Sequence, residues 1–160
     1  MTNPSIQTLS FIFDNDTDYI LLHQISGEGP LKRKHSGIKG SPGLLEDLNN
    51  AAIRSMVETT GLEILDAVLR GVIKTIQEET QTVVIYFVFE TDKFFGELNN
   101  NLPASNKWMD ILNIFNLEME GLVHELMPTL LDGESFFEGT IHLNEQQEVI
   151  SSDIRICNSI

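Results

Sequence analysis

Two short segments near the start of the chain have the pattern of β-strands. Residues 8–13 and 19–23 are rich in apolar and β-branched side chains, and residues 14–18 between them are polar and mostly acidic. Two such runs joined by a short polar segment are typical of a hairpin. The stretch that follows, residues 27–43, is rich in Gly, Pro, Ser and basic residues, and a loop of this length is often functional.

A helical pattern follows this loop. Apolar residues recur there at helical spacing on one face, namely Leu45, Leu48, Ala52, Met56 and Val57. Asp47 is of a residue type that commonly begins a helix, and Gly61 is of the type that commonly ends one. The sequence therefore predicts an amphipathic helix that stops at Gly61.

The second half of the chain predicts further strands and a second helix. Residues 63–76 and 82–90 are β-type, and the later segment is apolar on both faces, which predicts a central strand buried on both sides. An apolar stripe through residues 115–131, from Phe115 onward, predicts a helix that Pro128 kinks or interrupts.

A short apolar segment begins at Trp108, and residues 135–137 and 149–156 predict extended structure near the end of the chain. The order of these elements predicts an α/β fold, an α/β/α sandwich with a mixed β-sheet. We expect one domain over residues 1–160, with a C-terminal extension at about 132–160.

Composition and charge narrow the classes of partner. The chain has 160 residues, with 24 acidic against 10 basic residues and a net charge of −14. Such a surface repels phosphate backbones, so we expect no nucleic-acid partner and no docking on anionic membranes. The longest apolar run, residues 83–89, is too short to span a membrane. With one cysteine, Cys157, and no secretory signal, we expect a reduced, cytoplasmic protein.

The basic residues are unevenly placed. Lys32, Arg33, Lys34 and Lys39 put four of the ten basic residues within eight positions, beside His35. Such a cluster attracts a small anionic ligand in an otherwise repelling field, although charge runs are also common in solvated loops. Both interpretations stay open on the sequence alone.

Residues 40–62 carry a spaced motif. It consists of a glycine, five residues, a glutamate, seven residues, and then Arg-Glu-hydrophobic-any-Glu-Glu-any-Gly-hydrophobic. Seven of the nine defined positions match, namely Gly40, Glu46, Arg54, Met56, Glu58, Gly61 and Leu62. The segment resembles the Nudix box, and with the surrounding strands and late helix the chain resembles small bacterial MutT-like Nudix hydrolases.

This resemblance implies a Nudix-like fold and the reaction of that family. Its members use Mg²⁺ or Mn²⁺ to hydrolyse nucleoside-diphosphate-linked substrates, with the ion held by glutamates on one face of the box helix. By the same resemblance, Arg54 and Glu46 orient the box rather than perform chemistry. A nucleotide is the small anionic ligand that the family suggests.

Several expected carboxylates are replaced in this chain. Ser55 and Thr59 stand where the family has glutamates, and no Asp or Glu occurs between Leu98 and Met109, where many members have a further acid. Glu58 is the one matched carboxylate of four and our candidate metal ligand. We therefore expect hydrolysis to be impaired or lost, and Mg²⁺ or Mn²⁺ binding to be doubtful.

Lys39 replaces a glycine of the family pattern, and we hypothesise that its ammonium group binds phosphate where a metal ion would otherwise lie. Two alternatives remain. In the first, an active hydrolase recruits other carboxylates, such as Glu46, Asp47, Glu78 or Glu79. In the second, the chain is an interaction module or homodimer that uses Phe136 and Phe137.

Overall fold

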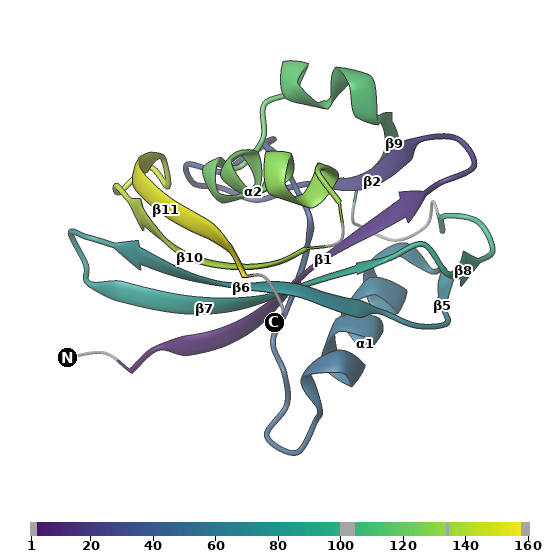
Figure 1. The fold of residues 1–160 in the computed structure, drawn as a ribbon, viewed down its shortest axis with the longest axis horizontal. Helices are drawn as coiled ribbons and strands as arrows, with labels where there is room; N and C mark the ends of the chain where they lie inside the picture. The colour runs from purple at the N-terminus through teal and green to yellow at the C-terminus, as the bar shows by residue number, and fades with distance from the viewer. Residues whose placement is uncertain (1–2, 100–104, 134, 158–160) are drawn as a thin grey trace.

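The computed structural model describes residues 3–99, 105–133 and 135–157. Its main feature is a mixed β-sheet with one α-helix on each face (Figure 1). The strands are β1 (Ser5–Asp14), β2 (Tyr19–Gln24), β3 (His35–Ser36), β4 (Ile38–Gly40), β5 (Glu63–Ile64), β6 (Val68–Gln77), β7 (Thr82–Thr91), β8 (Phe94–Phe95), β9 (Ser105–Asp110), β10 (Phe136–Leu143) and β11 (Val149–Cys157). The helices are α1 (Leu48–Thr60), the 3₁₀ helix η1 (Ile111–Asn116) and α2 (Gly121–Leu131). The predicted α/β fold with a mixed sheet is confirmed.

The strand order in the main sheet is β11-β10-β6-β7-β1-β2-β3, with β4 also paired to β1 and β9 to β2. Strand β1 runs parallel to β7, and β10 runs parallel to β6, while the other pairs are antiparallel. The predicted hairpin is β1 and β2, and the C-terminal residues add β10 and β11 to the sheet beside β6.

Alternate residues of β1 serve two different cores. Leu9, Phe11 and Phe13 pack in the core that contains α2, whereas Ile12 packs in the core that contains α1. This division follows from the period of two along a strand, which sends neighbouring side chains to opposite faces. The sheet therefore separates the α1 side of the molecule from the α2 side.

Helix α1 ends as predicted but begins later than its apolar pattern suggests. Asp47 is the N-cap residue, and Gly61 ends the helix with a left-handed φ of 77°, its N–H donating to the carbonyl oxygen of Val57. Leu45, which we included in the helical stripe, lies before the helix and is 96% exposed. The β4–α1 connection holds it away from the core.

Three other predictions need correction. The stripe from Phe115 to Leu131 is divided between η1 and α2, and Phe115 is exposed. Pro128 does not interrupt α2, which continues to Leu131, and the alternative of a kink stays a prediction. β7 is central, as predicted, but its side chains at Val83, Ile85 and Phe87 are only half-buried, because α1 covers part of that face.

Candidate functional site

The motif of residues 40–62 forms a strand–loop–helix unit that runs from β4 through residues 41–47 into α1. Gly40 lies directly against the helix, since a Cβ built there would be 1.9 Å from Ser55 Oγ and 2.8 Å from Thr8 Oγ1. Such distances are far inside van der Waals contact, so only glycine fits without movement of its neighbours. The glycine of the motif thus allows β4 and α1 to pack closely.

Arg54 holds the loop against α1. Its Nε donates to Glu46 Oε2 at 2.7 Å, and its Nη2 donates to Glu46 Oε1 at 2.9 Å and to the carbonyl oxygen of Ser41 at 3.1 Å. Glu46 Oε1 also accepts from the Gly43 N–H at 3.0 Å. The hydrogen bonds from Arg54, followed by that from Gly43, lower the pKa of Glu46 to about 2. The pKa of Arg54 is raised by the same contact.

The helix face that would carry the family's metal ligands is occupied by other interactions. Ser55 is buried, and its Oγ donates to the carbonyl oxygen of Ala51 at 2.9 Å. Glu58 is exposed and accepts from Arg54 Nη1 at 3.3 Å. The carbonyl oxygen of Thr59 accepts from Asn106 Nδ2 at 2.8 Å.

This donor set does not fit a Mg²⁺ or Mn²⁺ ion, which takes several oxygen ligands and usually at least one or two carboxylates. The one carboxylate of the face is shared with Arg54, and the serine hydroxyl points back into the helix. Within residues 3–99, 105–133 and 135–157, no group of three or more His, Cys, Asp or Glu side chains is arranged to hold a metal ion. Part of the segment between Leu98 and Met109, residues 100–104, lies outside the described residues.

The other carboxylates that we considered as ligands are not brought together. Glu46 is engaged by Arg54, and Asp47 begins α1 and accepts from Asn50 Nδ2 at 3.4 Å. Glu78 lies at the turn between β6 and β7, where its Oε1 is 2.9 Å from Nδ1 of His142 on β10. Glu79 is exposed in the same turn.

A cavity of about 310 Å³ lies between β2, β4 and the end of α1. Its lining comes from β2, from the segment of residues 25–39 that follows, and from α1, namely His23, Ile25, Leu31, Ser36, Gly37, Ile38, Lys39 and Thr59. Burial lowers the pKa of His23, and its hydrogen bond with Asn106 acts in the opposite direction without reversing the shift. His23 is therefore neutral near pH 7 and offers hydrogen bonds to this cavity rather than charge.

Lys39 extends from β4 on the side opposite to α1. Ile38 packs in the α1-side core, whereas Lys39 pairs in register with Leu9 and reaches Glu120 at the start of α2. Its Nζ lies 2.7 Å from Glu120 Oε2 and 5.6 Å from the centroid of the Tyr86 ring. The sequence-based hypothesis placed this ammonium group beside the metal-binding face of α1. The structure places it on the other side of β4, next to α2.

Glu120 is a functional candidate that sequence reasoning missed. It is 3% exposed, and its Oε1 accepts from Ser36 Oγ at 3.0 Å while its Oε2 accepts from Lys39. Burial alone would lower the pKa of Lys39, but the attraction of Glu120, with a smaller contribution from Tyr86, raises it above its usual value. No local pattern singles out Glu120, because its partners lie more than eighty positions away.

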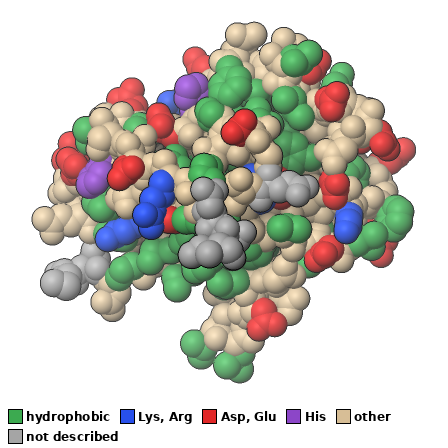
Figure 2. Space-filling model, viewed as in Figure 1, with side chains coloured by type: hydrophobic (Ala, Val, Ile, Leu, Met, Phe, Trp, Pro, Cys, Tyr) green, Lys and Arg blue, Asp and Glu red, His purple; other side chains and the backbone are tan. Residues whose placement is uncertain are grey.

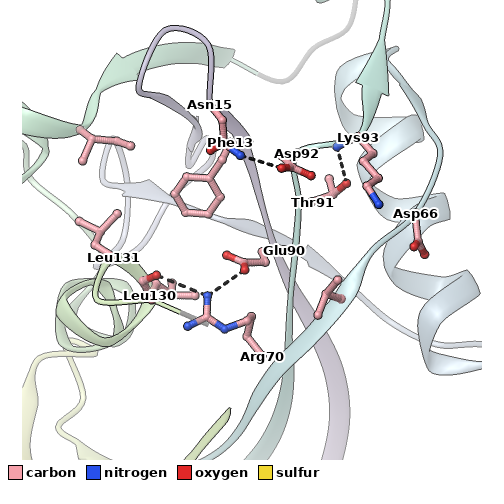
Figure 3. A pocket seen from close by; sticks show the side chains of 13 residues that line it. Phe13, Asn15, Asp66, Arg70, Glu90, Thr91, Asp92, Lys93, Leu130 and Leu131 are labelled. Atoms are coloured by element: carbon pink, nitrogen blue, oxygen red, sulfur yellow. Dashed lines mark hydrogen bonds and ion pairs between the residues drawn. The ribbon is translucent and has the colours of Figure 1, made fainter. Parts of the chain in front are cut away.

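A larger cavity, of about 620 Å³, lies at the other end of β1 (Figure 3). Arg70 is buried there, where its Nη1 contacts Glu90 Oε1 at 2.8 Å and its guanidinium donates to the carbonyl oxygens of Thr129 and Leu130. Arg70 thus satisfies the last carbonyls of α2, which a helix end leaves without partners. The motif residues do not line this cavity.

Comparison with known proteins supports the resemblance seen in the motif. No family model matches the chain. The chain is 24% identical over 110 residues to the uncharacterized Nudix hydrolase YvcI of Bacillus subtilis (strain 168). The aligned segment covers 66% of this chain and 70% of that protein.

Solved structures show the same fold. The mutator MutT protein from Bacillus halodurans superposes with a TM-score of 0.83 at 19% identity, covering 94% of this chain and 97% of that one. The NUDIX domain of Shewanella oneidensis NrtR, solved in complex with ADP ribose, gives a TM-score of 0.70 at 12% identity, covering 82% and 89%. No helix in the described part of the chain has the length and apolar character needed to cross a membrane.

Proposed function

We propose that this chain, which belongs to the Nudix superfamily, binds a small anionic, nucleotide-like ligand and that its metal-dependent hydrolysis is impaired or lost. The observation that carries the proposal is the state of the α1 face, where Ser55 is bonded back to Ala51 and Glu58 to Arg54. Ion-assisted phosphoryl chemistry needs a cation held against such a face. These residues do not provide the carboxylates for it.

Four observations support ligand binding. The cavity beside β4 combines apolar walls from Ile25, Leu31 and Ile38 with the polar groups of Ser36 and Lys39. Its volume of about 310 Å³ is at the lower end of the range for small-molecule sites. The basic loop of residues 32–34 adjoins it, and the NrtR domain of the same fold was solved with ADP ribose.

Lys39 is the proposed phosphate-binding residue. Lys39 is among the residues that line the cavity, and its side chain is 29% exposed although it extends toward Glu120. We expect an anionic ligand to reach the ammonium group from the side that Glu120 does not cover. Because Glu120 holds this charge in place, the ligand meets a positioned donor and does not have to order a flexible side chain. The homodimer, one of the alternatives left open by the sequence, and a cytoplasmic location are proposals as well.

The first prediction concerns ligand binding. We expect ADP-ribose or a nucleoside diphosphate to raise the melting temperature equally with and without Mg²⁺, because a ligand that binds only the folded state stabilises it. Replacing Lys39 alone would leave a buried carboxylate unpaired, so Lys39→Met is made in a Glu120→Gln background. Titration calorimetry should show about tenfold weaker binding than in Glu120→Gln alone, from loss of a charge-assisted hydrogen bond.

Lys93→Met is the matched control, since Lys93 lines the other cavity and should not affect affinity. Equal affinity of the double variant and of Glu120→Gln would contradict the role of Lys39. A Mg²⁺-stimulated release of phosphate that disappears in Glu58→Gln would instead favour the active hydrolase that uses non-standard ligands.

The second prediction restores the missing ligands. Ser55→Glu with Thr59→Glu adds two carboxylates to the α1 face beside Glu58, at spacings that share one side of a helix. We expect Mn²⁺ affinity, measured by electron paramagnetic resonance, to rise by at least about tenfold. Asn49→Glu with Asn50→Glu is the control, because it adds the same charge at the start of the helix. It should raise Mn²⁺ affinity less than the first pair does. Equal affinities in the two double variants would show that the face is not a latent metal site.

A further inference from the structure

The α1 side of the sheet is only partly covered. Along β6 and β7, alternate side chains face this side, and the pairs in register are Val72 with Phe87, Lys74 with Ile85, and Ile76 with Val83. Ile6 of β1 continues the row beside Ile85 and is 50% exposed. We call these seven residues the open face. Its apolar side chains on β6 and β7 are half-buried, because α1 packs against the part of the sheet nearer Ile12 and Phe89.

The loop before α1 presents two leucines to solvent on this same side of the sheet. Leu44 and Leu45 are 99% and 96% exposed. They lie in the loop that projects below the sheet in Figure 1, and Figure 2 shows hydrophobic side chains gathered at its tip. The hydrogen bonds of Glu46 to Gly43 and Arg54 hold the loop in place, so the exposure of the leucines does not come from a loose chain.

The two apolar surfaces carry opposite charges. Lys74 is an exposed cation in the middle of the open face, and within the described residues it makes no hydrogen bond or ion pair. Asp47 lies two positions after Leu45 and is exposed, and its carboxylate accepts a hydrogen bond from the amide of Asn50 at 3.4 Å. A surface with Leu44, Leu45 and Asp47 is therefore complementary to one with Ile85, Phe87 and Lys74.

We propose that the open face binds a second copy of this chain. In a two-fold symmetric dimer each residue contact occurs twice, so both complementary surfaces must be present on one molecule, as they are here. Leu44 and Leu45 of each copy pack on Ile85 and Phe87 of the other, and Asp47 lies beside Lys74. Exposed apolar patches next to a paired charge are typical of association sites.

Charge favours a second copy of the chain as the partner, and the open face rather than other parts of the surface as the place where it binds. Two copies that each carry −14 repel one another, and contact is least costly where acidic residues are balanced. Next to the open face, Glu138 of β10 is paired with Arg155 of β11, and the exposed Asp153 of β11 lies in register two strands from Lys74, so acidic and basic residues are balanced here. An unrelated partner with a leucine-rich, acidic loop would fit the same face and is an outcome of the test.

The test is a charge exchange followed by sedimentation velocity over a concentration series. Lys74→Glu alone and Asp47→Lys alone should each weaken the dimer about tenfold, because each places like charges opposite one another. The two changes together should restore the wild-type dissociation constant to within about threefold. Leu44→Ser with Leu45→Ser should abolish the dimer.

Leu112→Ser is the control, since Leu112 is 87% exposed but lies in η1 on the α2 side of the sheet. Circular dichroism verifies that each variant folds. A wild-type chain that stays monomeric up to hundreds of micromolar overturns the proposal, and a monomer that binds another protein through Ile85 and Phe87 also overturns it and assigns the open face to that partner. A dimer that none of these variants weakens also overturns it.

Discussion

At the scale of single residues, Glu46 makes the stability of the fold depend on pH. Its carboxylate accepts two hydrogen bonds from Arg54 and one from Gly43, and these lower its pKa from 4.5 to about 2. The unfolded chain takes up this proton near pH 4.5, whereas the folded chain takes it up near pH 2. The carboxylate therefore stabilises the fold fully above pH 4.5, and this contribution is lost as the pH falls from 4.5 to 2.

The third prediction follows from this linkage. The free energy of unfolding of Glu46→Gln should be lower than that of the wild type by a constant amount above pH 4.5, and the difference should narrow between pH 4.5 and 2. Urea unfolding at several pH values measures it. Glu145→Gln, at an exposed turn position, is the control. Its free energy of unfolding should change with pH in the same way as that of the wild type. A difference for Glu46→Gln that does not change with pH would contradict the role of the ionised form.

Single residues also mark where sequence reasoning reached its limit. The resemblance implied that Arg54 and Glu46 orient the motif, and the two side chains are hydrogen-bonded to each other across one short loop and one helix; their role stays a prediction. The motif has a limit, however. It could not indicate on which side of β4 Lys39 extends, since that depends on the pairing of β4 with β1. Glu120 was missed for the same reason, because its partners Ser36 and Lys39 reach it only through tertiary structure.

At the scale of elements, the contact of β4 with α1 depends on one missing side chain. The fourth prediction is that Gly40→Ala lowers the free energy of unfolding by about 2 kcal/mol, because its Cβ would lie 1.9 Å from Ser55 Oγ and must displace it. Gly43→Ala is the matched control, since its nearest neighbour, the Cβ of Glu46, is 3.7 Å away, and it should change stability by less than about 0.5 kcal/mol. Equal effects of the two substitutions in urea unfolding would show that the contact is not tight.

Elements with a local signal were predicted well, and those decided by tertiary contacts were not. The β1–β2 hairpin and the end of α1 at Gly61 follow from turn residues and a C-cap, which act within a few positions. The apolar stripe of residues 115–131 suggested one helix, but Leu117 and Glu118 are extended or irregular, with the carbonyl of Glu118 bonded to the N–H of His35. β7 has apolar side chains on both faces, yet one face is partly open, which its own sequence does not indicate.

At the scale of the whole molecule, the net charge of −14 opposes compactness. The fifth prediction is that the melting temperature at pH 7 rises when NaCl is increased from about 0.01 M to about 0.1 M, which shortens the screening length from roughly 30 Å to roughly 10 Å. Differential scanning calorimetry measures it. Near pH 4.5, the isoelectric point, the same salt change should have little effect. An equal rise at both pH values would indicate an effect of salt other than screening.

The parallel pairing of β1 with β7 has a consequence for synthesis of the protein. β1 emerges from the ribosome before β7, and this partner for one of its edges, residues 82–91, is completed more than seventy residues later. Until then a strand destined for the middle of the sheet has an unpaired apolar edge, which is the kind of segment that aggregates. Nascent chains that stop before β7 should therefore depend on chaperones far more than the finished protein does.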